Sequence, residues 1–282
     1  MRIRRATQAG SFYAGNAESL KRQVESCFLH RFGPAKLPKV SVNGDRKIVG
    51  LLSPHAGYMY SGPVAANAYY ELAVDGKPET IVVLGPNHTG YGSALALMDE
   101  GVWQTPLGDV EIDSLVAHEL CRETSLIDID ETAHRFEHSI EVQLPFLQYL
   151  FGNQFKFVPI CFQLQDFVSA DEVGNALAEV LSERNAVVIA SSDFTHYEPQ
   201  VSAELKDLKA LEAVKAMDAK RFVDIVEEQD LTVCGYGPIA AAITASRGLL
   251  AIKATLLRYK TSGDITGDKS SVVGYAAASF AK

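Results

Sequence analysis

Six apolar segments rich in β-branched residues alternate with helix-like segments along the chain, and this order constrains the fold most strongly. Segments such as IVGLL, TIVVLG and AVVIAS are continuously apolar, which predicts strands covered on both faces. Strands alternating with helices predict an α/β fold, a sandwich whose central mixed or mostly parallel sheet is flanked by helices. The predicted strands are Lys47–Leu52, Thr80–Gly85, Phe155–Phe162, Ala186–Ser191, Ile252–Tyr259 and Ser271–Phe280.

Helical patterns fill the intervals between these strands. Pro63 and Pro238 lie near helix starts, where the missing N–H costs nothing. Residues 94–113 predict a hairpin, and residues 33–47 predict a surface connection. That connection comes too early to separate two domains, so residues 1–282 are expected to form one domain. The predicted helices are Ala17–Phe32, Pro63–Ala73, Ser114–Glu123, Glu137–Phe151, Ala170–Arg184, Val201–Ala216, Ala219–Glu228 and Pro238–Arg247.

The composition excludes several classes of partner. The formal net charge of −9 argues against a nucleic-acid partner, because phosphate binding usually shows a basic excess. Arg2, Arg4 and Arg5 form a short terminal cluster that is expected to be a solvated arm. No apolar run approaches the roughly 20 residues of a membrane helix, and the first residues lack a signal-peptide core. A cytoplasmic protein without a membrane partner is therefore expected.

Three histidines follow three of the predicted strands at the point where each strand ends. His55 lies in SPHAGYMYSG, His88 in GPNHTGYG and His196 in SSDFTHYEP. In an open α/β sheet, ligands bind beyond the carboxyl ends of the strands. Because neutral imidazoles are common metal ligands, we expect these rings to converge on one metal site.

Two further segments supply candidate residues. Asp193 precedes His196 by three residues, so its carboxylate either orients that ring or caps the turn before the next helix. In HRFEHSIEVQLPFL, Glu137 is expected at a helix start, where a carboxylate suits the helix dipole. We expect His134 to be structural, whereas His138 is open to a structural or a functional interpretation.

The four cysteines are widely spaced without a CxxC pair, which argues against a disulfide framework and a zinc ribbon. Cys27, Cys121 and Cys161 lie in apolar segments and are expected to be small core residues. Cys234 lies in a glycine-rich turn before a helix that starts with proline. Helix N-termini lower thiol pKa values, so Cys234 is a candidate ligand or nucleophile.

Seven motifs, taken together and in order, resemble those of the Memo family. The resemblance extends from about residue 5 to residue 279. It implies a fold similar to LigB-type class III extradiol dioxygenases, which hold a non-haem iron with two histidines and a carboxylate. It also implies an Ammecr-type protein and a radical-SAM protein as partners, because prokaryotic members are described in such a three-part system. The motifs are QAGSFYAG, SPHAGYMYSG, LGPNH, WQTPLGDVEID, EHSIEVQLPFL, SSDFTHY and CGYGPI.

The matching motifs imply roles for single residues of this sequence. His55 and His88 match the two metal histidines, and Cys234 falls where the dioxygenases place the metal carboxylate. His196 matches the acid/base histidine, while Asp193 and His138 match further catalytic-pocket residues. Cysteine in place of a carboxylate gives a softer site, which suits copper or zinc as well as the favoured iron. Dioxygenase activity therefore does not follow from the fold.

The sequence thus predicts a metal-binding, dioxygenase-like protein with redox chemistry on an unknown small substrate. In this interpretation His196 moves a proton and Asp193 steers it. One alternative is a non-catalytic module that recognises a small ligand, a peptide or a protein partner in the same pocket. Another is a zinc-assisted hydrolase with His196 as the base to a metal-bound water.

Overall fold

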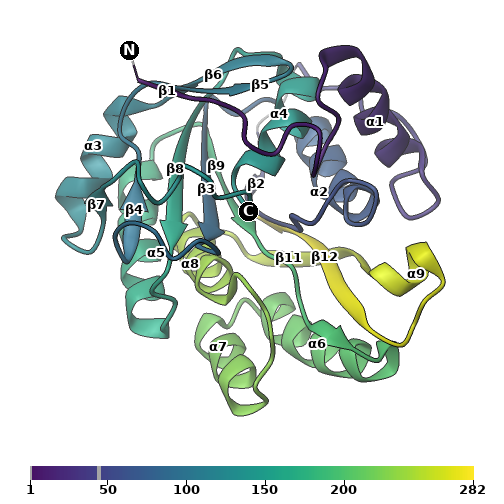
Figure 1. Cartoon of the computed structure of the whole chain (residues 1–282). Coiled ribbons are helices and arrows are strands. Elements are labelled where there is room, and N and C mark those ends of the chain that lie inside the picture. The colour runs from purple at the N-terminus through teal and green to yellow at the C-terminus, as the bar shows by residue number, and fades with distance from the viewer. Residues whose placement is uncertain (1, 43–45) are drawn as a thin grey trace.

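A mixed β-sheet runs through the centre of the molecule in the computed structural model, which describes residues 2–42 and 46–282 (Figure 1). Within these ranges, twelve strands belong to the sheet. They are β1 (Ile3–Arg4), β2 (Ile48–Ser53), β3 (Thr80–Pro86), β4 (Leu95–Leu97), β5 (Val102–Thr105), β6 (Gly108–Ile112), β7 (Asp128–Ile129), β8 (Lys156–Phe162), β9 (Ala186–Ser191), β10 (His196–Glu198), β11 (Lys253–Thr261) and β12 (Val272–Ala281).

The centre of the sheet is parallel and one side is antiparallel. Strands β8, β3, β9 and β2 are parallel neighbours in that order, with Val82 opposite Val158 on one side and Val188 on the other. Strand β12 pairs antiparallel with β2 and with β11. The carboxyl ends of β2, β3 and β9 therefore meet at one edge of the sheet, as the α/β prediction requires.

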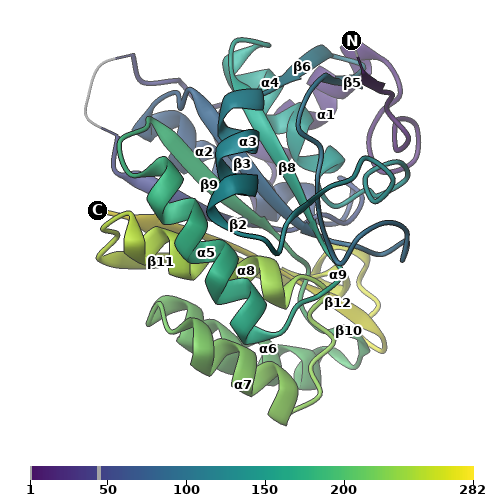
Figure 2. The same ribbon diagram turned by 90° about the vertical axis from the view of Figure 1, so that its left-hand side faces the viewer.

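Helices cover both faces of the sheet and define two apolar cores. Helices α1, α2 and α4 lie on one face, and α3, α5 and α8 lie on the other (Figures 1 and 2). Alternate residues of β9 point into the two cores, with Val187 in one and Val188 in the other. The helices are α1 (Ala17–Leu29), α2 (Gly62–Asp75), α3 (Ser114–Glu123), α4 (Leu144–Phe151), α5 (Phe167–Leu181), α6 (Gln200–Lys215), α7 (Ala219–Glu228), α8 (Tyr236–Gly248) and α9 (Ser262–Thr266), together with the 3₁₀ helix η1 (Glu141–Gln143).

Side-chain caps explain where several helices begin. Asn16, Asp113, Asp166 and Asp218 each precede a helix, and each side chain accepts a backbone N–H from the first turn. These bonds satisfy donors that a helix start otherwise leaves without partners. None of the helices within the two described ranges has the length and hydropathy needed to cross a membrane.

The predicted α/β architecture with a mixed sheet is confirmed, and each of the six predicted strands matches an observed strand to within two residues at either end. The predicted hairpin at residues 94–113 contains the antiparallel pair β5–β6. Residues 43–45 of the predicted surface connection lie outside the described ranges. The predicted helix at Glu137–Phe151 is wrong in its first part, because helical structure begins only at Glu141.

Candidate metal centre

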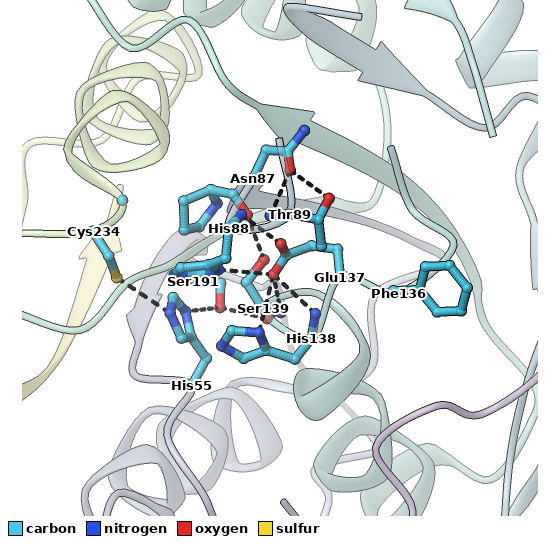
Figure 3. Close-up of polar contacts among 12 residues, drawn as sticks. His55, Asn87, His88, Thr89, Phe136, Glu137, His138, Ser139, Ser191 and Cys234 are labelled. Carbon is cyan, nitrogen blue, oxygen red and sulfur yellow. Dashed lines mark hydrogen bonds and ion pairs between the residues drawn. The ribbon is translucent and has the colours of Figure 1, made fainter. Parts of the chain in front are cut away.

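Two of the three histidines expected to converge, His55 and His88, do so at the carboxyl edge of the parallel strands, whereas His196 does not belong to the group of rings within ligand distance of one another. His55 lies two residues beyond the end of β2, and His88 lies two residues beyond the end of β3. His138 reaches the same place from the loop before η1 (Figure 3). One ring nitrogen from each of these three histidines lies within 4.8 Å of one from each of the others. The chain therefore presents three imidazoles at the spacing of a metal site.

The three rings pack closely against one another. The ring centroids of His88 and His138 are 4.4 Å apart and stacked, and both rings contact His55 at centroid distances of 5.2 and 5.3 Å. Burial, together with the neighbouring imidazoles, holds the pKa of His55 well below its usual range. Burial also lowers the pKa of His138 to about 4. These two imidazoles are therefore neutral near pH 7, the form that binds metals.

Glu137 is the carboxylate that holds this cluster together. Its Oε1 lies 2.9 Å from Nδ1 of His88 and accepts the backbone N–H groups of His138 and Ser139, while its Oε2 accepts the backbone N–H of His88. Although burial opposes ionisation, the hydrogen bond to His88 and the electrostatic effect of the His88 and His138 rings lower the pKa of Glu137 to about 2. Since an ionised carboxylate only accepts, Nδ1 of His88 carries the proton and Nε2 is left for a ligand. The sequence pattern indicated only a helix start for Glu137. It did not reveal this role, because the contacts with His88 join distant parts of the chain.

Cys234 approaches the cluster from the loop before α8. Its Sγ lies 3.2 Å from Nε2 of His55 (Figure 3). The same sulfur lies 3.2 Å from the backbone nitrogen of Asp193. The expected lowering of the thiol pKa is wrong for the metal-free chain. Burial, reinforced by the charge of Asp193, raises the pKa of Cys234 above its ordinary value.

Asp193 is held against the His55 loop. Its Oδ1 accepts the backbone N–H of His55 at 2.8 Å. Burial raises the pKa of Asp193 to about 6, even though this hydrogen bond favours the ionised form. The alternative role as a helix cap is wrong, because α6 begins at Gln200 after Pro199.

His196 is half-buried on β10, and its ring is oriented by a residue that the sequence did not reveal. Nδ1 of His196 lies 2.7 Å from the backbone carbonyl of Thr232, and its backbone N–H donates to the Thr232 hydroxyl. The prediction that Asp193 orients this ring is therefore wrong. Because a carbonyl only accepts, Nδ1 carries the proton and Nε2 is free to accept another.

Strand β12 fixes the loop that carries Asp193 and His196. Gly274 accepts the backbone N–H of Phe194 at 2.8 Å and donates its own N–H to Thr195 at 2.9 Å. A side chain at position 274 would meet the Asp207 carboxylate at far below van der Waals distance, so only glycine fits there. The loop after β9 is therefore fixed by a strand near the other end of the chain.

The N-terminal segment is part of the site rather than a solvated arm. Arg4 is buried, and its guanidinium donates to the carbonyls of His134 and Glu137 and to Glu141. The Phe12 ring packs against the His138 ring at a tilt, with a centroid distance of 4.6 Å. The expectation of a solvated arm is wrong for Arg4 because its partners lie more than 125 residues away in sequence.

His134 has the structural role expected of it. Its side chain is completely buried, and its ring meets the Trp103 ring edge-on at a centroid distance of 5.5 Å. Burial, together with the charge of Arg4, lowers its pKa to about 3. A neutral ring at this place suits a core contact.

The donor atoms fit a transition-metal ion. Imidazole nitrogens and a nearby thiol are ligand types that iron, copper and zinc accept. On the side away from the cluster, Ser191 contacts Nδ1 of His55 and Glu137 contacts Nδ1 of His88, which orients both rings. A helix-covered mixed sheet with a histidine cluster at its carboxyl edge defines an α/β protein with a metal-type site. The Memo-like protein family model matches residues 4–279, and the chain belongs to this family.

Curated relatives and a solved structure agree with this assignment. MEMO1 family proteins from Methanopyrus kandleri and Methanothermobacter thermautotrophicus are each 52% identical, covering 96% and 97% of this chain and 96% and 99% of their own. A MEMO1 family protein from Methanocaldococcus jannaschii is 51% identical over 98% of both chains. The structure of an uncharacterized protein from Escherichia coli K12 is similar with a TM-score of 0.56 and 14% identity, over 82% of this chain and 99% of that one. This last likeness shows the fold alone.

Proposed function

We propose that this protein binds a divalent or redox-active metal ion, with iron favoured and copper or zinc as alternatives, and that with iron or copper it carries out oxygen-linked chemistry on a small substrate. The observation that supports the proposal most directly is the convergence of His55, His88 and His138 within ligand distance of one another. Memo family membership supports the same assignment across nearly the whole chain.

His55 and His88 are the two ligands on which sequence and geometry agree. For the third ligand, the family motif favours Cys234, whose thiol lies beside Nε2 of His55. The ring spacing favours His138, which belongs to the convergent group. We propose Cys234 as the third ligand and His138 as a pocket residue able to replace it, because a thiolate adds the softer donor that copper and iron accept.

When bound, the metal would supply a Lewis-acidic, redox-active centre for dioxygen and substrate. The chain's own residues would manage protons around it. Nε2 of His196 is free to accept a proton, since Thr232 holds the proton on Nδ1. Asp193, with a pKa of about 6, exchanges a proton close to neutral pH. Phe12 covers one face of His138 and limits water on that side.

Anaerobic reconstitution with Fe(II), Cu(I) and Zn(II), followed by elemental analysis and oxygen-uptake measurement, tests the proposal. We expect each chain to retain one tightly bound metal ion, and we expect oxygen uptake only with iron or copper. A His118→Gln variant is the matched control, because His118 lies on α3, contacts Asp99 and does not belong to the convergent group.

The outcomes separate the alternatives. Retention of no metal by the wild-type protein would contradict the proposal. Retention of metal without oxygen uptake across candidate small substrates would favour the non-catalytic binding module. Hydrolytic turnover with zinc alone would favour the hydrolase.

A further inference from the structure

Behind the metal centre, a buried chain of hydrogen bonds connects helix α2 to the outer nitrogen of His55. The hydroxyl of Tyr69 donates to Oε1 of Gln143 at 2.5 Å, and Nε2 of Gln143 donates to Oγ of Ser191 at 2.7 Å. Oγ of Ser191 lies 2.9 Å from Nδ1 of His55. All four side chains are at most 2% exposed, so water does not compete for these contacts.

The orientation of the Gln143 amide is fixed by a backbone carbonyl. Nε2 of Gln143 also donates to the carbonyl of Pro54 at 3.1 Å. If the amide were turned over, its oxygen would face this carbonyl, and two acceptors would meet without a proton between them. The amide NH₂ therefore faces Pro54 and Ser191, and the amide oxygen faces Tyr69.

The proton of the Ser191 hydroxyl is equally committed. Oγ of Ser191 lies 2.6 Å from the carbonyl of Ser139, which can only accept. The single hydroxyl proton therefore goes to Ser139, and Gln143 donates to one lone pair of the oxygen. What is left for His55 is the second lone pair, so Nδ1 of His55 must be the donor.

We infer that Tyr69, Gln143 and Ser191 form a directional hydrogen-bond chain that keeps the proton of neutral His55 on Nδ1 and turns the Nε2 lone pair into the metal site. In the metal-free chain, Nε2 then accepts the S–H proton of Cys234, whose Sγ is 3.2 Å away. Ser191 and Gln143 are positioning residues that act through His55. The inference rests on the proposed function for its purpose, but the tautomer itself exists without metal.

The tautomer is measured directly in metal-free protein with ¹⁵N-labelled histidine, by long-range ¹H–¹⁵N correlation at pH 7.5. The signals of His55 are assigned from a His55→Asn variant. We expect Nδ1 of His55 to show the protonated pattern and Nε2 the unprotonated pattern. A protonated Nε2 in the wild-type protein would overturn the inference.

Two variants each remove a different hydrogen bond of the chain that leads to His55. Ser191→Ala removes the acceptor of Nδ1, and Gln143→Met removes the donor that, together with the Ser139 carbonyl, fixes the orientation of the Ser191 hydroxyl. We expect both to populate the Nε2-protonated form and to weaken metal binding about 10- to 100-fold, the usual effect of removing an outer partner of a ligand histidine. A wild-type tautomer pattern in both variants would overturn the inference.

Gln148→Met is the matched control. Gln148 is also buried and also bridges three polar groups, but its partners are Thr105, Gly108 and Asn153. This variant should lose stability without changing the His55 tautomer. If Gln148→Met shifted the His55 tautomer as much as Gln143→Met, a general loss of stability would explain the effect and the inference would fail.

The experiment separates this inference from the proposed function. A wild-type protein with the Nδ1 proton but no affinity for any of the three metals would support the hydrogen-bond chain and contradict metal binding. A wild-type protein that binds metal tightly but carries its His55 proton on Nε2 would support metal binding and contradict the hydrogen-bond chain.

Discussion

Oε1 of Glu137 lies 2.9 Å from Nδ1 of His88, and Oε2 of the same carboxylate accepts the backbone N–H of His88 at 2.6 Å. One buried side chain therefore fixes both the ring and the backbone of a proposed metal ligand. The same carboxylate anchors the loop that carries His138, so two imidazoles depend on a single negative charge.

Glu137→Gln is expected to lower metal affinity by about 10- to 100-fold, because the amide NH₂ would face either the His88 ring N–H or its backbone N–H. Chelator competition measures the change. Glu111→Gln is the control, since Glu111 forms only an exposed ion pair with Lys156. Equal affinities in the two variants would show that Glu137 does not orient a ligand.

Metal affinity should rise with pH between 5.5 and 7.5. The pKa of the Cys234 thiol is raised by burial, so metal binding must expel its proton, and each expelled proton favours binding at higher pH by about tenfold per unit. His138, with a pKa of about 4, is already neutral across this range and contributes little to the slope. Metal titrations at the two pH values should show that the affinity of Cys234→Ser rises less steeply with pH than the affinity of the wild type. Identical slopes would move the third ligand from Cys234 to His138.

His196→Ala should leave the metal bound and reduce proton-dependent turnover by about 10²- to 10⁴-fold, the usual contribution of a positioned acid or base. Elemental analysis gives the metal content, and oxygen uptake gives the turnover. Loss of metal in His196→Ala combined with full occupancy in Cys234→Ser would exchange the two assignments.

Arg4→Met should destabilise the protein by about 3–5 kcal/mol, because it leaves the buried Glu141 carboxylate without its cation. Metal affinity should fall as well, since Arg4 also holds the carbonyl of Glu137. Denaturant unfolding measures the first effect. Arg2→Met, which removes the ion pairs of a half-exposed arginine with the buried Asp99 and the exposed Glu100, should destabilise the protein much less than Arg4→Met, because solvent screens the Arg2 guanidinium.

The buried His134 should make the fold sensitive to acid. Its pKa is about 3 in the folded chain and about 6.5 when unfolded, so the unfolded state binds a proton first as pH falls. The corresponding stability is complete above pH 6.5 and is lost progressively down to pH 3. In His134→Leu, unfolding midpoints should depend less on pH between 7 and 5. An unchanged pH dependence would show that the acid sensitivity arises elsewhere.

Local patterns were sufficient to predict the long strands of the sheet and the place of the site, but not the short strands β1, β4, β7 and β10. Continuous apolar segments mark β2, β3 and β9, and the histidines that follow them share an edge because parallel strands end together. Two of the three clustered imidazoles, His55 and His88, were found in this way, and His138 was placed in the pocket by motif.

The remaining features depend on contacts between distant parts of the chain. Glu137 lies outside the expected helix and accepts the backbone N–H of His88, 49 residues away, and Arg4 is buried by partners more than 125 residues away. Thr232 orients His196 from 36 residues away. No periodicity or propensity encodes such pairings, because each exists only once the sheet has brought its loops together.

The two backbone bonds between Gly274 and the loop after β9 set an order of events during synthesis. His55 and His88 leave the ribosome long before β12, but the loop bearing Asp193 and His196 lacks its two bonds to Gly274 until that strand is added. A nascent chain therefore displays exposed imidazoles without a finished pocket. The pocket of the proposed metal site is therefore complete only after β12 has been made.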